Sequence, residues 1–182
     1  MYKYMHDKGH PEAKSKEVPF PELPVAWAGT YNDGGQDIFA KFSIHLCLNP
    51  DVAGNSELYN IANERESHSL AERWPTVAEH FGLVGLPPVE PSHPEHRRTE
   101  AWMVEHADVL DAMLKETGIE LPSMDYDYAG DFLCGTLVIT HDLCLNKARS
   151  TGFVEEESFS SSFHNCFERY KKVGRVYIGS KA

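Results

Sequence analysis

The chain has 182 residues, of which 41% are hydrophobic, 11% aromatic and 25% charged, a composition that excludes fibres and long disordered chains. Its 17 lysines and arginines and 28 aspartates and glutamates give a net charge of −11, which argues against nucleic acid or an anionic membrane as a partner. No apolar run approaches the roughly 20 residues of a membrane span, and the N-terminus lacks the apolar segment of a secretory signal, so we expect a cytoplasmic protein.

The first third of the chain predicts two helices separated by an extended segment. Residues 1–9 have helical spacing and stop at Gly9, like the end of a helix whose beginning lies outside the chain. Three prolines within residues 18–24 forbid helix and favour an extended path along a surface. Apolar residues at 35–48 cover more than one side, which predicts a helix buried on several sides and ended by Asn49 and Pro50.

The middle third predicts a strand, a helix and a linker. Residues 57–62 are β-prone and flanked by polar residues, so we expect a strand there. Either Ser67 or Ser69 can cap a helix over residues 70–81, which Gly82 would close. Four prolines within residues 86–94 then predict a linker or an arm.

The last third predicts two helices on either side of an ambiguous segment. Apolar residues at helical spacing over 99–117, with Gly118 as the stop, predict a long helix. Residues 126–139 are aromatic and apolar, and could form a helix as far as residue 134 followed by an extended piece. Acidic residues at 155–157 precede the apolar positions of 159–170, and basic residues end that run, so the charges follow the dipole of a last helix.

No motif in the sequence by itself identifies a nucleotide, metal or nucleophile site. The glycines never form the G-x-G-x-x-G or G-x-x-x-x-G-K-[ST] patterns that cradle phosphates, and no G-x-S-x-G elbow places a serine. His93, His96 and His106 lack the companions that would complete a tetrahedral set, so we expect no metal. The four cysteines are scattered without a C-x-x-C pair, which predicts reduced core thiols: Cys47, Cys134, Cys144 and Cys166.

Tyr4 and Lys8 have a spacing that is found in hydride-transfer enzymes. On a helix, Tyr-x-x-x-Lys lets the lysine lower the pKa of a tyrosine one turn away for proton transfer. Here the pair stands at the start of the chain, with no cofactor loop before it, in a sequence with eight tyrosines. We therefore interpret it as a chance match.

Several segments, in order along the chain, resemble blocks of one family. Residues 18–21 (VPFP) are similar to a Pro-Leu-x-Phe-Pro-Gly segment, and residues 58–63 (LYNIAN) to a Phe-Asn-x-x-Asn-Gly-Asp strand and loop. Residues 73–83 resemble a Leu-Trp-Pro-x-Ile-Ala-x-Tyr-Phe-Gly helix, and residues 146–153 a Lys-Ala-Arg-x-x-Gly-Phe motif. The chain thus resembles the C-terminal half of an extended or atypical short-chain dehydrogenase/reductase, in the progesterone 5β-reductase and iridoid synthase-like group with its many fungal members.

The resemblance implies a helix-rich α/β (α+β) fold with about five helices, a few short strands and no complete Rossmann sheet. It implies one domain over residues 1–182, with a sheet-edge part at 1–85 and a helical cap part at 95–182. The family's nucleotide-binding half and catalytic tyrosine and lysine lie upstream of this region. NADP(H) is therefore implied for a full-length relative, while this chain alone is expected to bind no cofactor, and no catalytic residue is carried over.

Two departures from the family concern loops, and one implication concerns the surface. Glu22 stands where the family has glycine, and Glu64 and Arg65 replace Gly-Asp, so we expect altered loops at the substrate mouth. In full-length relatives the segments matching residues 58–62 and 37–48 lie against the cofactor-binding sheet. Without that sheet they would expose backbone groups and an apolar face, which a second copy, a Rossmann-type subunit or a local rearrangement must cover.

Three functions remain open on the sequence. The first is the substrate-binding portion of an NAD(P)-dependent reductase acting on a small apolar enone or carbonyl metabolite of secondary metabolism; the resemblance implies as pocket candidates Phe20, Trp27, Phe39, Phe42, Tyr126 and Phe132. The second is a non-catalytic truncated paralogue that binds a partner or itself. The third is a cofactor-independent isomerase or cyclase with an apolar pocket, for which the candidates are His45, Asp125, Asp127 and His141.

Overall fold

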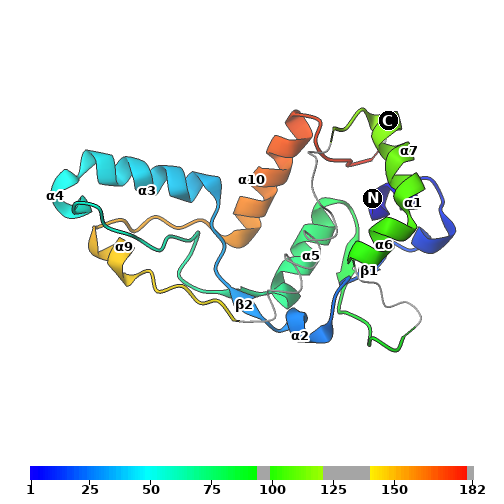
Figure 1. Ribbon diagram of the computed structural model, residues 1–182, viewed down its shortest axis with the longest axis horizontal. Coiled ribbons are helices and arrows are strands. Elements are labelled where there is room, and N and C mark those ends of the chain that lie inside the picture. Colours follow the sequence, from blue (N-terminus) through cyan, green and yellow to red (C-terminus); the bar gives the residue numbers. More distant parts are fainter. Residues whose placement is uncertain (94–98, 121–139, 180–182) are drawn as a thin grey trace.

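The computed structural model describes residues 1–93, 99–120 and 140–179. Several residues singled out in the sequence lie outside these ranges: His96, Asp125, Tyr126, Asp127, Phe132 and Cys134. In the described part, helices predominate, and the strands form two small two-stranded sheets. Figure 1 shows an elongated arrangement with α3 and α4 at one end and α1 and α7 at the other. No helix of the described residues has the length and apolar character needed to cross a membrane.

The elements alternate short strands with helices of one to four turns. The helices of the described part, in chain order, are α1 (Tyr2–Asp7), the 3-10 helix η1 (Pro11–Ala13), α2 (Pro24–Trp27), α3 (Gln36–Leu48), α4 (Pro50–Ala53), α5 (Leu70–His80), α6 (Thr99–Glu105), α7 (Ala107–Thr117), α9 (Asn146–Ser150) and α10 (Phe159–Lys172). The strands are β1 (Glu17–Pro19), β2 (Thr30–Tyr31), β3 (His68–Ser69) and β4 (Val84–Leu86). β1 pairs with β4 in parallel, and β2 pairs with β3 in antiparallel fashion.

The five helices predicted from the sequence are all present, one of them in two pieces. The helix expected over residues 99–117 is interrupted at His106, whose backbone angles of φ −111° and ψ 31° separate α6 from α7. The His106 ring donates from Nδ1 to the carbonyl oxygen of Trp102 at 2.9 Å. The His106 side chain is therefore hydrogen-bonded to the carbonyl of the residue one turn earlier, at the point where the helix is interrupted. The short helices α2, α4 and α9 were not predicted.

The strand predicted over residues 57–62 is wrong. Ile61 and Ala62 are buried, but this segment pairs with no strand among the described residues. The next residue makes the backbone contacts instead, because Asn63 donates from its N–H to the Asp33 carbonyl at 2.7 Å and accepts from the Glu157 N–H at 2.8 Å. β-prone residues form a strand only where another strand can complete the ladder.

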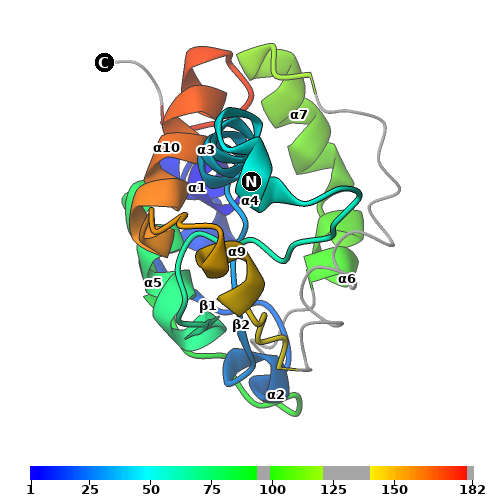
Figure 2. The same ribbon diagram turned by 90° about the vertical axis from the view of Figure 1, so that its left-hand side faces the viewer.

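The prediction that α3 is buried on several sides is also wrong. Ile38 and Phe42 are buried, whereas Phe39, Ile44 and Leu48 are 45%, 59% and 75% exposed. Figure 2 looks onto this end of the molecule, with α4 in front of α3. One face of α3 thus packs against the interior of the molecule, while apolar residues on its other faces are exposed to solvent.

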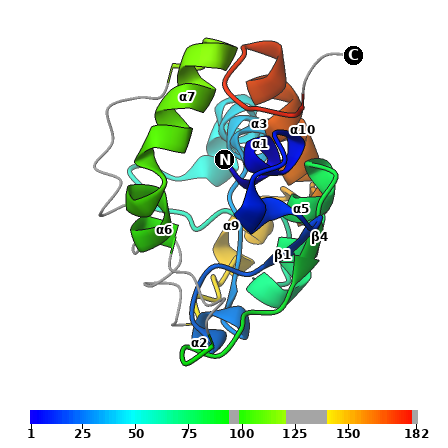
Figure 3. The ribbon, with the colours of Figure 1, turned by 90° about the vertical axis from the view of Figure 1, so that its right-hand side faces the viewer.

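Two hydrophobic clusters form the core of the described part. The first lies between α3, α9 and the segments beside them: Ile38, Phe42, Ile61, Ala148 and Phe153, with Leu46 and Tyr59 packed against it. The second lies under α5 and the β1–β4 pair: Val18, Ala78 and Leu83, with Tyr2, Trp74 and Phe81 packed against it. Gly85 of β4 allows this close packing, because a Cβ there would approach the Trp74 carbonyl oxygen to 2.9 Å. Figure 3 shows this second region, with α1 between α7 and α5.

Candidate functional site

The described aromatic residues that were predicted to line one substrate pocket lie in separate places. Phe20 is buried and packs on Trp27, with ring centroids 5.3 Å apart. Phe42 belongs to the cluster around α3 and contacts Phe153 edge-on at 5.2 Å. Phe39 lies on α3 with its side chain half exposed. These residues are not brought together around one cavity, and their role in substrate binding stays a prediction.

Tyr4 and Lys8 both bind one carboxylate, and Lys8 Nζ also lies 5.4 Å from the Tyr4 ring centroid. The Tyr4 hydroxyl donates to Glu116 Oε2 at 2.8 Å, and Lys8 Nζ lies 2.5 Å from Glu116 Oε1. The hydrogen bond to Glu116 raises the pKa of Tyr4, which is the opposite of what a proton-transferring tyrosine needs. The three side chains join α1 to α7, and this supports the interpretation of the Tyr-x-x-x-Lys spacing as a chance match.

The histidines proposed for an isomerase or cyclase also have other partners. His45 Nε2 donates to the Thr151 carbonyl oxygen at 2.9 Å, and its ring packs against Phe153. His141 is exposed, and its backbone N–H donates to the Thr30 carbonyl at 2.8 Å. Neither histidine is paired with a carboxylate in the contacts described, so the geometry offers no acid–base pair from them.

The expectation of core thiols is wrong for the three cysteines that the structure describes. Cys47, Cys144 and Cys166 are free and exposed. Cys47 lies on α3 and Cys166 on α10, both on helices with a large solvent-facing side. Within the described ranges, no three histidine, cysteine or acidic side chains gather as a metal site would require.

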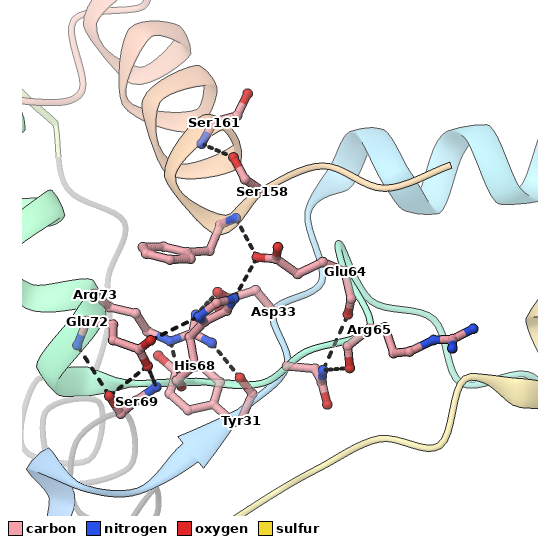
Figure 4. Close-up of polar contacts among 12 residues, drawn as sticks. Tyr31, Asp33, Glu64, Arg65, His68, Ser69, Glu72, Arg73, Ser158 and Ser161 are labelled. Atoms are coloured by element: carbon pink, nitrogen blue, oxygen red, sulfur yellow. Dashed lines mark hydrogen bonds and ion pairs between the residues drawn. The ribbon is translucent and has the colours of Figure 1, made fainter. Parts of the chain in front are cut away.

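The largest of the fully buried side chains belongs to Arg73 on α5. It is 2% exposed and forms an ion pair with Asp33, and its guanidinium also donates to the Tyr31 carbonyl and, at 3.0 Å, to the His68 carbonyl. The guanidinium carbon lies 3.9 Å from the Tyr31 ring centroid. Burial lowers the pKa of Arg73. Figure 4 shows how these contacts fasten α5 to β2, β3 and the loop before α3.

The loop between residues 63 and 68 extends this network to α10. Glu64 accepts from the Phe159 N–H at 2.8 Å and lies 3.1 Å from His68 Nε2 (Figure 4). Ser158 caps the same helix by accepting from the Ser161 N–H at 3.2 Å. Two N–H groups of the first turn of α10 are thereby satisfied. Glu64, one of the departures from the family pattern, thus fixes the start of α10.

A pocket of about 280 Å³ opens beside this network, between the start of α3 and the inner side of α10. We call it the α3–α10 pocket, and its lining residues are Asp33, Gly34, Gly35, Gln36, Asp37, Asn63, Phe159, Ser162, Phe163, Cys166, Arg169 and Tyr170. Arg169 Nη2 binds both carboxylate oxygens of Asp37, at 2.8 and 2.6 Å. Asn63 is 1% exposed; its Oδ1 accepts from the Gly35 N–H at 2.6 Å, and its Nδ2 has no hydrogen-bond partner among the described residues.

A smaller pocket of about 170 Å³ lies between α5 and α10. Its wall includes His80, whose ring stacks on Phe167 at 4.6 Å. Burial lowers the pKa of His80, which favours the neutral form of the ring. The wall thus combines aromatic rings with the carboxylate of Glu79 and the hydroxyls of Thr76 and Ser160.

The segment from β2 through Gly34 and Gly35 to α3 has the strand–glycine–helix order of a dinucleotide site. A pyrophosphate there needs open glycine backbone at the helix N-terminus. A Cβ on Gly34 would meet the Phe39 ring at 2.5 Å, and one on Gly35 would meet Ser162 Oγ at 2.5 Å, so close approach of these side chains requires glycine at both positions. The first turn of α3 also carries the carboxylate of Asp37, which disfavours a pyrophosphate at this helix N-terminus.

Sequence reasoning missed Arg73 and Asn63. Arg73 stands at helical spacing with Leu70 and Val77, on the apolar face of the helix predicted over residues 70–81. A charged residue in that position was the available signal of a buried ion pair. Asn63 belongs to the segment 58–63 that resembles the family, and nothing else in the sequence indicated that its side chain is buried.

The sequence matches the family described as a PRISE-like Rossmann-fold domain over residues 4–171. It is 24% identical over 175 residues to the short chain dehydrogenase ausT of Aspergillus calidoustus, an alignment that covers 95% of this chain and 40% of that protein. It is 26% identical over 169 residues to the short chain dehydrogenase sirQ of Leptosphaeria maculans, covering 92% of this chain and 42% of the relative. The short chain dehydrogenase sirR of the same organism is 28% identical over 182 residues, covering 94% and 43%.

The chain thus spans about two fifths of the length of the curated relatives it matches. The resemblance to short-chain dehydrogenases is confirmed at the level of the superfamily, and full-length relatives of this Rossmann type imply a nicotinamide cofactor. The mixed α/β composition is also confirmed, while the expected lack of a complete Rossmann sheet stays a prediction. Since the family match takes in most of the sequence, the chain belongs to the PRISE-like Rossmann-fold domain family.

Proposed function

We propose that this chain is the substrate-binding portion of an NAD(P)-dependent reductase in the progesterone 5β-reductase and iridoid synthase-like group. Its substrate is a small apolar enone or carbonyl metabolite of secondary metabolism. The observation that carries the proposal is the alignment of nearly the whole chain with about two fifths of each short chain dehydrogenase. The reductase-like chemistry belongs to those relatives, and the chain corresponds to one part of them.

The geometry supports a substrate-side role in two ways. The α3–α10 pocket combines aromatic walls with a few fixed polar groups, which is typical of small-molecule sites. The first turn of α3, which follows the glycine segment, carries the Asp37 carboxylate, and this charge disfavours a pyrophosphate there. NADP(H) and the proton donor would then come from the remaining part of a full-length relative, since Tyr4 is held by Glu116.

A chimera tests this function. The part of the sirQ dehydrogenase to which this chain does not align is joined to this chain, and NADPH oxidation is followed with cyclohexenone as the substrate. We expect turnover from the chimera and none from either part alone. In the control chimera, the same part of sirQ is joined to the segment of sirR that aligns with this chain. Turnover by the control chimera without turnover by ours, or turnover by the isolated chain, would contradict the proposal.

We further propose that a Rossmann-type segment or subunit covers the exposed apolar surface of α3 and α4. Ile44 and Leu48 lie four residues apart on one side of α3 and are 59% and 75% exposed, Val52 on α4 is 45% exposed, and Leu58 just beyond is 88% exposed. Several exposed apolar side chains on neighbouring segments are typical of an interaction site. A second copy of the chain is the alternative occupant.

A further inference from the structure

The side-chain amide of Asn63 is buried at the α3–α10 pocket, and only half of its hydrogen-bonding capacity is used by the described residues. Its Oδ1 is occupied by the Gly35 N–H, which fixes the orientation of the amide. Its Nδ2 carries two donors and has no partner among the described residues, although the side chain is 1% exposed. A buried donor without a partner is destabilising, so its retention points to an acceptor that is supplied from outside the chain.

Other donors at the same pocket agree with an acceptor ligand. The N-terminus of α3 has no side-chain cap, so the first N–H groups of this 13-residue helix lack partners within the helix. Two residues of that turn, Gln36 and Asp37, line the pocket, as does the hydroxyl-bearing Ser162. The pocket is therefore rich in hydrogen-bond donors at the end where Asn63 lies.

The charges of the pocket favour an uncharged ligand. Asp37 is neutralised by Arg169, and Asp33 by Arg73, so neither arginine is free to bind an anion. An anionic ligand would also lie beside the two carboxylates, whereas a carbonyl oxygen accepts hydrogen bonds without bringing a charge. Phe159, which also lines the pocket, offers a ring to an apolar ligand body.

The pocket volume sets the size of the ligand. About 280 Å³ is slightly below the range of roughly 300–1,000 Å³ that is usual for drug-sized ligands. We propose that the α3–α10 pocket binds an uncharged carbonyl compound of one or two rings, whose carbonyl oxygen accepts a hydrogen bond from Asn63 Nδ2. The choice of a carbonyl compound rests on the proposed function, whereas the existence of the site rests on the pocket and on Asn63.

Cys166 provides a direct test, because it is exposed and lines the pocket. The wild-type chain is alkylated with iodoacetamide, with and without the two-ring ketone α-tetralone, and the modification of each cysteine is followed by mass spectrometry. We expect α-tetralone to slow alkylation of Cys166 about tenfold when its free concentration is about ten times its dissociation constant. Cys47 and Cys144, which are exposed and do not line the pocket, are the internal controls.

The hydrocarbon tetralin tests the role of the carbonyl, because it has the same rings and lacks the oxygen. One hydrogen bond corresponds to about a fivefold difference in affinity, so tetralin should protect Cys166 at least that much less strongly. Equal protection by the two compounds, or equal protection of all three cysteines, would overturn the proposal.

Asn63→Asp tests the amide, because an aspartate keeps an oxygen for the Gly35 N–H and loses the donor. We expect this variant to lose the protection by α-tetralone. Asn60→Asp, which adds the same charge at an exposed position of the same loop, should retain it. Circular dichroism checks both folds, and the wild-type comparison of α-tetralone with tetralin decides the matter if Asn63→Asp does not fold. All these measurements use the chain alone and omit NADPH, so the chimera experiment can contradict the proposed function and leave this binding result unaffected.

Discussion

Arg73 carries a full charge into the interior, and its surroundings explain how that is tolerated. Its guanidinium has an ion pair with Asp33, two backbone carbonyl acceptors and the face of Tyr31. The contacts with Asp33 and Tyr31 join α5 to a segment that is distant in the sequence, whereas His68 lies just before the helix. A buried charge with this many partners gives the fold specificity, because an alternative packing would leave it unpaired.

Arg73→Met is expected to lower the free energy of unfolding by about 3 kcal/mol or more, because it leaves the Asp33 carboxylate and two backbone carbonyls without their donor. Urea denaturation followed by circular dichroism measures it. The matched control is Arg65→Met, since the side chain of Arg65 is exposed and points away from the network (Figure 4). The control should stay within about 0.5 kcal/mol of the wild type. Equal stability of the two variants would contradict the account of Arg73.

Glu116 makes the stability depend on acidic pH. The hydrogen bond from Lys8, followed by that from Tyr4, lowers the pKa of Glu116 below its ordinary value of 4.5. Because the folded-state pKa is the lower one, the stabilisation is present above pH 4.5 and is lost as the pH falls through the folded-state pKa. We expect Glu116→Gln to lose stability less steeply than the wild type on acidification, in urea titrations over a series of pH values. Glu105→Gln, at an exposed position without an ion pair in the described part of the chain, is the control. Parallel curves for the wild type and Glu116→Gln would exclude this contribution.

At the scale of elements, the sequence was informative wherever the signal is local. α5 and α10 were predicted from caps, charges and apolar spacing, and all of these act within a few residues of one another. The failed strand at 57–62 and the exposed sides of α3 depend on what lies next to them in space. The same reason hid the α3–α10 pocket, whose walls come from segments around residues 33–37, 63 and 159–170.

The cap of α5 is a test at this scale, because the sequence left Ser67 and Ser69 as alternatives. Ser69 is the cap, and it forms a capping box in which its hydroxyl accepts from the Glu72 N–H while the Glu72 carboxylate accepts from the Ser69 N–H. Ser69→Ala should therefore lower the free energy of unfolding by about 1 kcal/mol. Ser67→Ala should leave it nearly unchanged. The reverse order of the two effects in urea denaturation would show that the helix begins elsewhere.

For the whole molecule, the main feature is the apolar surface at the end formed by α3 and α4. It lies opposite the end where α1 meets α7, so a partner could cover it without disturbing that contact (Figures 1 and 3). The relatives contain more than twice the length of this chain, and a Rossmann-type segment among the remainder is the occupant that we propose. Self-association in the absence of such a partner would follow from the same surface.

This surface makes a prediction for the isolated chain. We expect concentration-dependent association in sedimentation velocity, which the double variant Ile44→Lys and Leu48→Lys should abolish, because it places two charges on the exposed side of α3. Val173→Lys, at a residue that is 68% exposed beyond the end of α10, is the control and should associate like the wild type. A wild-type chain that stays monomeric at high micromolar concentration would contradict the proposed interaction surface.

The central claim is that this chain supplies the substrate side of a reductase and holds no dinucleotide of its own. The most direct measurement is a titration of the purified chain with NADPH, followed by the fluorescence of the nicotinamide. We expect no saturable binding of NADPH by the chain alone at concentrations up to millimolar. We expect saturable binding by the chimera in which this chain is joined to the part of sirQ to which it does not align. Saturable micromolar binding by the isolated chain would contradict the claim.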